Sequence, residues 1–104
     1  MKKLSRREEQ ILLAVWNLRE RAYLLSIKKY LSEVTGLNRS VGAIHKPLRI
    51  LERTGYLTAD LGEATAKRGG RRKRIYTVTD AGLRMLDQLQ QMHDILWADF
   101  RGIG

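Results

Sequence analysis

The chain reads Lys67-Arg68-Gly69-Gly70-Arg71-Arg72-Lys73-Arg74 between two short stretches that are typical of β-strands. Six of these eight residues are cationic, and the two glycines permit a tight turn. The flanking stretches are 56–61, where apolar residues alternate, and 74–79, which is rich in β-branched and aromatic residues. The pattern therefore predicts a β-hairpin whose long connection, residues 62–73, carries a concentrated positive charge.

Three helices are predicted on the N-terminal side of the hairpin. Ser5 and Glu8 have the spacing of a capping box and indicate a first helix over about 5–20. A second helix is expected from Leu25 or Ser26 to Val34, because Gly36 provides a natural terminus.

The third helix is expected to begin after Ser40 and to end at Gly55. Ile44, Leu48 and Leu51 fall on one face of it. Pro47 lies inside this segment and removes one backbone hydrogen bond, so a helix with a bend is expected there.

A last helix is expected from Thr79 or Asp80 to about Phe100. Its apolar stripe is too large for a helix that packs on one side only, so it requires a partner. The residues predicted to form a homodimer contact are Leu86, Leu89, Met92, His93, Leu96 and Phe100.

The order helix, helix, helix, strand, strand, helix predicts a mainly α fold with a small β-hairpin. Three helices followed by a hairpin form a winged helix-turn-helix, in which the hairpin is the wing. We assign residues 1–79 to this unit and residues 80–104 to a C-terminal dimerisation helix of the same compact domain. A chain of 104 residues is expected to form one domain.

The charge distribution favours a polyanionic partner. Residues 1–79 contain 18 Lys and Arg against 7 Asp and Glu, whereas residues 80–104 contain 2 against 4. A basic body of this kind is typical of nucleic-acid-binding proteins. A basic protein whose charge serves only solubility is the alternative reading.

Five segments, in this order and spacing, resemble the PadR family of bacterial transcription regulators over residues 4–90. They are Val41-Gly42-Ala43-Ile44-His45-Lys46-Pro47-Leu48, Leu51-Glu52-Arg53-Thr54-Gly55-Tyr56-Leu57, Gly62-Glu63-Ala64-Thr65, Arg68-Gly69-Gly70-Arg71-Arg72-Lys73-Arg74-Ile75-Tyr76 and Thr77-Val78-Thr79-Asp80-Ala81-Gly82. The resemblance implies a homodimer that binds double-stranded operator DNA, usually as a repressor, through the third helix and the wing. It also implies that the last helix supplies much of the dimer contact.

The resemblance and the charges give a set of candidate DNA-binding residues. They are Tyr23, Ser40, Gly42, Ala43, His45, Lys46, Arg49, Lys67, Arg68, Arg71, Arg72 and Lys73. Many members of the family carry tyrosine where this chain has His45, so the role of this imidazole stays open. Tyr23 resembles a backbone-contacting tyrosine of the family, and packing on the first helix is its alternative role. Small residues at 42 and 43 would let the backbone approach a groove, and Lys46 and Arg49 would reach a phosphate or a guanine edge.

Two further readings remain open. Some PadR-like proteins hold a flat hydrophobic effector between tryptophans at the dimer interface, and Trp97 is similar in position; plain dimer packing is its other possible role. A basic winged-helix module that binds RNA or a protein partner is the alternative to a DNA-binding regulator.

Other functions are excluded by what the sequence lacks. It contains no cysteine, and its two histidines, His45 and His93, lie on different predicted helices, so we expect no metal site. No nucleophile motif, carboxylate pair or phosphate loop is present, so we expect no catalysis and no cofactor. The longest apolar run, 11–16, is too short to span a membrane, and a cytoplasmic location is expected.

Overall fold

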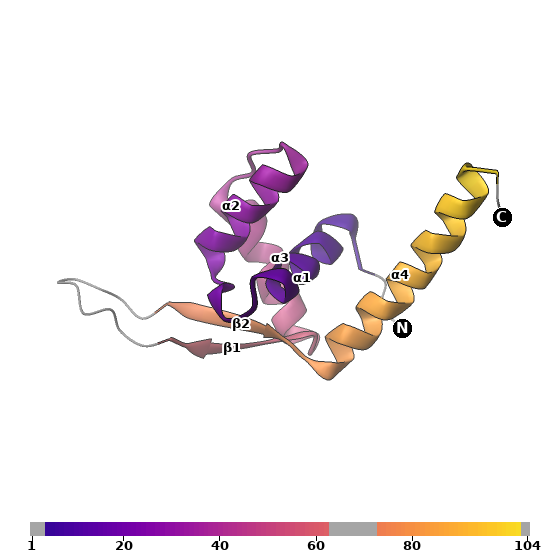
Figure 1. The fold of residues 1–104 in the computed structure, drawn as a ribbon. Coiled ribbons are helices and arrows are strands. Elements are labelled where there is room, and N and C mark those ends of the chain that lie inside the picture. The colour runs from indigo at the N-terminus through magenta and orange to yellow at the C-terminus, as the bar shows by residue number, and fades with distance from the viewer. Residues whose placement is uncertain (1–3, 63–72, 103–104) are drawn as a thin grey trace.

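The computed structural model describes residues 4–62 and 73–102 and has the element order that the sequence predicts. Helices α1 (Arg6–Leu18), α2 (Leu24–Thr35) and α3 (Val41–Arg53) come first. Strands β1 (Leu57–Leu61) and β2 (Arg74–Val78) follow, and α4 (Asp80–Phe100) ends the fold. Figure 1 shows the three helices gathered over the hairpin, with α4 projecting away from them. The predicted mainly helical fold with a small hairpin is confirmed.

The helix boundaries follow the capping residues. Ser5 and Glu8 form the predicted capping box: the Ser5 hydroxyl accepts from the Glu8 N–H at 3.1 Å, and the Glu8 carboxylate accepts from the Ser5 N–H at 2.8 Å. Helix α1 ends earlier than predicted, because Arg19–Arg21 form a short 3₁₀ turn, η1. Gly36 ends α2 with a φ of 74°, as a glycine just past a helix permits.

Helix α3 is continuous through Pro47. Ser40 caps it by accepting from the Ala43 N–H at 3.2 Å. Pro47 is buried together with Ile44, Leu48 and Leu51, so the proline ring contributes to the core. This packing is how the helix accommodates a residue that cannot donate its backbone hydrogen bond.

The two strands pair antiparallel, with Leu57 opposite Val78 and Leu61 opposite Arg74. The other edge of β2 is also occupied, since the Tyr76 N–H donates to the Ala22 carbonyl at 2.8 Å. The stem of the hairpin is therefore held from both sides. The connection between the strands lies outside the described residues, and so do four of the candidate DNA-binding residues, Lys67, Arg68, Arg71 and Arg72.

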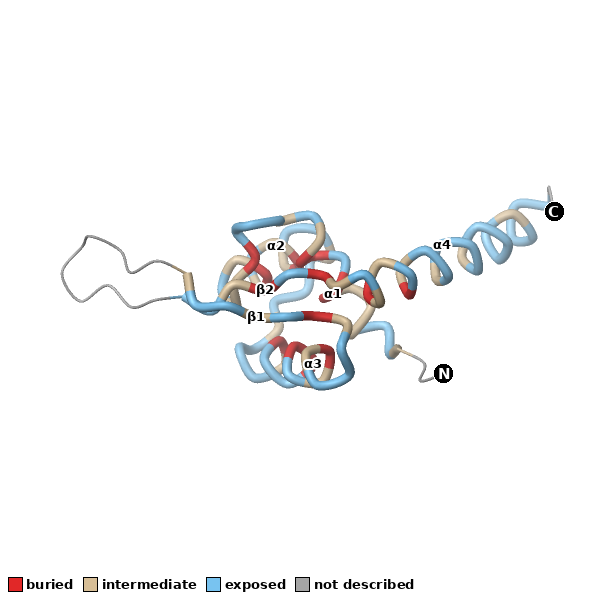
Figure 2. Tube along the Cα trace, turned by 90° about the horizontal axis from the view of Figure 1, so that it is seen from below, coloured by how far each residue is buried: buried red, intermediate tan, exposed pale blue. Residues whose placement is uncertain are grey.

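The core lies between α1, α3 and the hairpin (Figure 2). Its fully buried large side chains come from all three helices and from β1: Ile11, Leu12, Val15, Ile27, Ile44, Leu48, Leu51 and Leu57. Helix α4 joins this core only through its first turns, where Gly82 and Met85 are buried. Beyond these turns α4 diverges from the body, although His93 still contacts Glu9 of α1.

Gly82 fixes how closely α4 starts against the hairpin. A Cβ at this position would lie 2.5 Å from the Tyr56 carbonyl oxygen and 2.8 Å from Val78 Cγ1. We expect Gly82→Ala to lower the free energy of unfolding by about 1–3 kcal/mol, as overpacking does. Denaturant unfolding followed by circular dichroism measures this. Gly42→Ala is the matched control, since a Cβ at Gly42 meets nothing within 4 Å; equal stability of the two variants would contradict the packing argument.

Candidate nucleic-acid interface

Half of the predicted DNA-binding residues lie on α3 or at its N-cap. Ser40, Gly42, His45, Lys46 and Arg49 are all exposed, and Ala43 is half-buried. The opposite face of the helix is the one buried in the core. The structure therefore brings these residues together on one accessible side of a single, well-packed helix.

Gly42 on this face has no role within the described fold. It lies in the first turn of α3, has no positive φ, and would have open space around an added Cβ. Glycine in a helix costs about 0.5–1 kcal/mol relative to alanine. The packing does not require glycine here, and the open space around Gly42 leaves room for another molecule to approach the α3 backbone closely.

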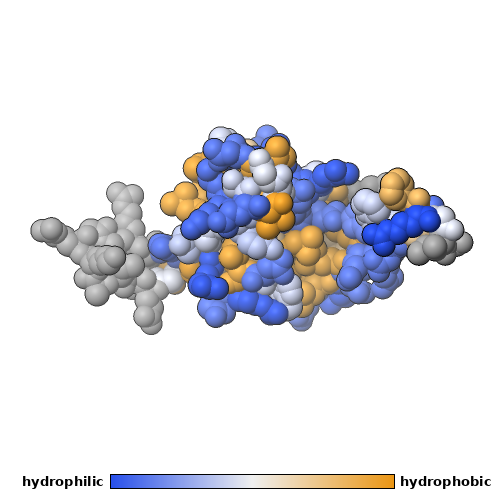
Figure 3. Space-filling view, turned by 45° about the horizontal axis from the view of Figure 1, so that its top comes forward, coloured by the Kyte–Doolittle hydropathy of each residue, from blue (hydrophilic) through white to orange (hydrophobic). Residues whose placement is uncertain are grey.

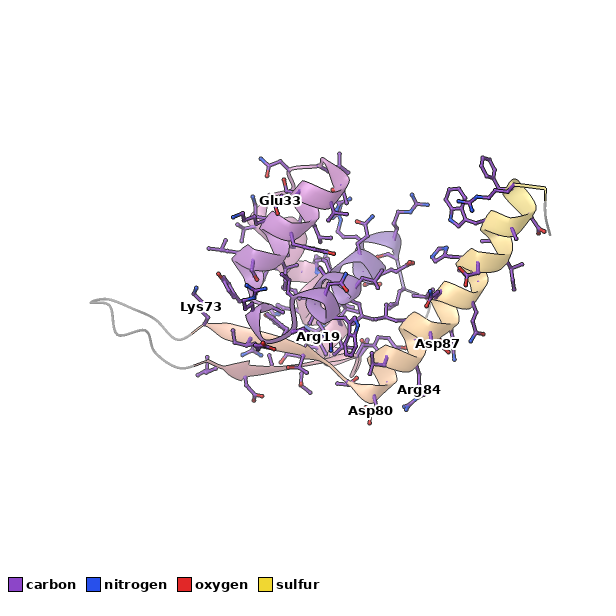
Figure 4. All side chains as sticks on the ribbon, viewed as in Figure 1. Arg19, Glu33, Lys73, Asp80, Arg84 and Asp87 are labelled. Carbon is purple, nitrogen blue, oxygen red and sulfur yellow. The ribbon has the colours of Figure 1, made fainter. Side chains whose placement is uncertain are left out.

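Tyr23 and Lys73, predicted separately, lie together at the base of the wing. Tyr23 is the residue that precedes α2, and the Lys73 ammonium lies 4.0 Å from the centroid of its ring. Figure 4 shows Lys73 at the outer end of β2, below the start of α2. This cation–π contact holds the exposed lysine beside the helical body. Tyr23 is half-buried.

On its other side, the wing is tied to α3 by an ion pair. Arg74 Nη2 donates to Glu52 Oε2 at 2.6 Å. The Glu52 carboxylate raises the pKa of Arg74 further above its ordinary value. Burial raises the pKa of the neighbouring Tyr76 hydroxyl, and the charge of Arg74 opposes that increase. Lys73 thus contacts the residue before α2, and Arg74 contacts α3.

The sequence analysis does not include Glu52 and Arg53 among the candidate residues, although both line a cleft beside the wing. A cleft of about 380 Å³ lies between the C-terminal half of α3 and the start of β2, lined by Arg49, Glu52, Arg53 and Arg74. The i, i+4 spacing of Arg49 and Arg53 was the available signal in the sequence, since such residues share one face of a helix. Only the fold reveals that Arg74 faces them.

The predicted dimerisation stripe on α4 divides into two parts. Leu86 and Leu89 line a groove of about 450 Å³ between α4 and α1 of the same chain, which also contains Leu13 and Trp16. His93 ends this groove, where its Nε2 lies 2.8 Å from Glu9 Oε2. The early part of the stripe is therefore partly used within the chain.

The second part of the stripe is free of the body. Met92, Leu96 and Phe100 are exposed, by 47%, 56% and 79% respectively. Trp97 is also exposed and packs edge-on against Phe100, with ring centroids 5.4 Å apart. Figure 3 shows apolar surface between the body and α4 and again toward the C-terminal end of α4. Large apolar side chains exposed together along one helix are typical of an interface between proteins.

Neither a metal cluster nor a membrane span is found in the described part of the chain. Within residues 4–62 and 73–102, no three His, Cys, Asp or Glu side chains come together as metal ligands, and His45 and His93 lie on α3 and α4. None of the helices described there is long and apolar enough to cross a membrane.

Comparison with known proteins gives one family. The family model described as "Transcriptional regulator PadR-like family" matches residues 12–88, more than half of the chain. This family comprises transcription regulators, in agreement with the prediction that the chain is not an enzyme. No curated protein matches the chain in sequence.

Solved structures of PadR proteins share the fold. A PadR family transcriptional regulator from Eggerthella lenta is 26% identical, with a TM-score of 0.72, over 94% of this chain and 83% of that one. A PadR-like regulator from Bacillus cereus is 21% identical, with a TM-score of 0.75, over 92% and 88% of the two chains.

A third structure is that of Bacillus subtilis PadR in complex with operator DNA. It is 23% identical, with a TM-score of 0.58, over 78% of this chain and 45% of that longer one. The family match, the helix–helix–helix–hairpin–helix order and the exposed basic face of α3 agree with one another, and the chain belongs to the PadR-like family of transcriptional regulators.

Proposed function

We propose that this protein is a sequence-specific DNA-binding regulator that acts as a homodimer on a pseudo-palindromic operator, as a repressor. The single observation that carries the proposal is the outer face of α3, where Gly42 stands free of any internal packing beside exposed His45, Lys46 and Arg49. A helix with this face is suited to enter the major groove, since its backbone can approach closely while its cations reach phosphates or guanine edges. Such a role would place the protein with the chromosome in the cytoplasm.

The wing supplies the second part of the proposed interface. Its cations, Lys67, Arg68, Arg71, Arg72 and Lys73, would contact phosphates beside the groove that α3 occupies. Two contacts at the start of β2 support this arrangement: Lys73 lies over the ring of Tyr23, and Arg74 pairs with Glu52. Together they hold the hairpin in position relative to α3. Tyr23 would lie at the edge of the same surface. A role in transcription regulation is supported by the family, and operator binding by the operator complex of the Bacillus subtilis protein.

Helix α4 would form the dimer. Its exposed Met92, Leu96 and Phe100 would pack against a second copy, with Leu86, Leu89 and His93 extending the contact toward α1. A symmetric dimer would place two α3 helices in successive major grooves, about 34–36 Å apart. Trp97 would lie at the same interface, where a flat hydrophobic effector would bind if the dimer leaves space beside it.

The test of the α3 interface is Gly42→Ala. We expect this variant to be as stable as the wild type or more stable by up to about 1 kcal/mol, because alanine favours helix. We expect its operator affinity to fall at least tenfold, because the added methyl group would keep the helix from its groove. Fluorescence anisotropy with labelled operator measures the affinity, and denaturant unfolding measures the stability.

Wild-type affinity in a folded Gly42→Ala variant would contradict the proposed approach of α3. The alternative function, an RNA- or protein-binding module, requires no dimer. Sedimentation of the wild type as a monomer at micromolar concentration would favour that alternative, since it leaves the apolar surface of α4 without its proposed partner.

A further inference from the structure

The cleft between α3 and the wing gathers three guanidinium groups. Arg49 and Arg53 come from successive turns of α3, and Arg74 comes from the first residue of β2. Glu52 contributes the single carboxylate of the lining. The cleft therefore holds an excess of positive charge, in a volume of about 380 Å³ that is open to an external group.

Glu52 acts on only one of the three arginines by a direct contact. Its Oε2 accepts from Arg74 Nη2 at 2.6 Å, and no other ion pair to Arg49, Arg53 or Arg74 occurs among the described residues. A guanidinium has five donors, so Arg74 keeps others available while the carboxylate fixes its direction. Glu52 is thus a positioning residue that holds Arg74 at the wall of the cleft.

Contacts within the chain account for only part of the gathering, since Glu52 pairs with Arg74 alone. Arg53 in the last turn of α3 interacts favourably with the helix dipole, but this explanation does not extend to Arg49 or Arg74. Like charges around one small cleft repel each other, so the arrangement gains from an anion between them. Guanidinium forks match the oxygens of a phosphate group in particular, which they contact through paired hydrogen bonds.

The position of the cleft indicates which phosphate it would take. Arg49 and Arg53 continue the exposed face of α3 that begins at Gly42 and passes Lys46. The cleft lies where this face meets the wing, the two elements that would contact the same duplex. A DNA strand that ran from a groove beneath α3 toward the wing would pass this cleft.

We propose that Arg49, Arg53 and Arg74 bind one phosphodiester group of the DNA backbone in this cleft, with Glu52 orienting Arg74. The proposal rests on the proposed function, since it specifies one contact of that interface. It adds DNA contacts for Arg53, at the C-terminal end of the exposed face of α3, and for Arg74, at the start of β2.

The test pairs a protein change with a change in the DNA backbone. Each phosphate of the operator is replaced in turn by an uncharged methylphosphonate, and affinities are measured for the wild type, Arg53→Ala and Arg74→Ala. At one phosphate of each half-site, the wild type is expected to lose about tenfold or more, as for charge-assisted hydrogen bonds. At that same phosphate, the two variants are expected to lose less than about threefold, because the contact is already absent.

The control is Arg84→Ala, which removes one positive charge from α4, where the side chain points away from the body (Figure 4). This variant is expected to keep the wild-type methylphosphonate profile. Circular dichroism of each variant establishes that it is folded, and Arg53→Ala serves alone if removal of Arg74 disturbs the wing.

Four results are decisive. A matched loss of sensitivity at one phosphate supports the proposal. Wild-type profiles in both variants would overturn it and leave DNA binding itself intact, whereas a wild type that binds no DNA would overturn the proposed function. In a further experiment, inorganic phosphate is compared with a chloride salt of equal ionic strength for its effect on operator affinity. If phosphate weakens binding more than chloride does, while neither arginine variant changes the methylphosphonate profile, the cleft binds a free anion and the proposed contact with DNA is overturned.

Discussion

Replacing Leu96 with aspartate is expected to convert the protein into a monomer and to lower its operator affinity by about 10²–10⁴-fold. Leu96 is 56% exposed at the centre of the free part of the α4 stripe, between Met92 and Phe100. A carboxylate there would be buried without a partner in the dimer, which is strongly unfavourable. Each DNA-binding unit would then bind one half-site without the gain that comes from linking two. Sedimentation equilibrium and operator titration measure the two effects.

Gln91→Asp is the matched control for this prediction. Gln91 is exposed on α4, about 140° around the helix axis from Leu96 at 3.6 residues per turn, so the same charge is introduced off the stripe. The control is expected to remain a dimer with an operator affinity within a few-fold of the wild type. A Leu96→Asp variant that stays dimeric and binds normally would remove α4 from the interface. Because Leu96 does not belong to the core, the monomer is expected to remain folded.

Replacing Arg71, Arg72 and Lys73 together with alanine is expected to produce the second large effect. If each cation neutralises one phosphate, the slope of log affinity against log salt should become shallower by about 2.7, at roughly 0.9 per phosphate. Affinity at low salt should fall for specific and unrelated DNA alike, because phosphate contacts carry no sequence information. Titrations at several salt concentrations, with an operator and with a scrambled duplex, measure the slopes.

A charge-matched variant separates the wing from the total charge. Arg19, Arg84 and Arg101 are exposed residues of η1, α4 and the end of α4, and their replacement by alanine also removes three charges. This variant is expected to keep most of the wild-type slope. If the wing variant kept the wild-type slope, the cationic hairpin would be a bystander in binding.

Local sequence chemistry predicts the fold of this protein closely. Ser5, Ser40 and Thr79 cap helices as expected, and Gly36 ends α2, because capping depends on residues within one turn of each other. The strands begin and end within one residue of their predicted bounds. The sequence does not predict the short η1 turn, because its helical pattern continues past Leu18. In the structure, α1 ends at this point because Arg19 has a φ of 56°.

The contacts between distant elements were harder to predict. The pairing of Lys73 with Tyr23 and of Arg74 with Glu52 joins residues 50 and 22 positions apart, which no local pattern reveals. The contact of His93 with Glu9 crosses 84 positions and shows that part of the α4 stripe faces its own chain. Sequence periodicity identified this stripe as apolar but not how it is divided between α1 and a second copy. The predicted positions in the wing tip lie outside the described residues, and the DNA-binding roles stay predictions.

In the proposed complex, two copies joined through α4 present two α3 helices to one duplex. Selection of bound sites from random double-stranded DNA, with the 104-residue chain, tests this arrangement. We predict that an inverted repeat will be enriched, with half-sites centred about one helical turn apart, 10–10.5 base pairs. Enrichment of a single unpaired half-site, or of no sequence at all, would contradict the account.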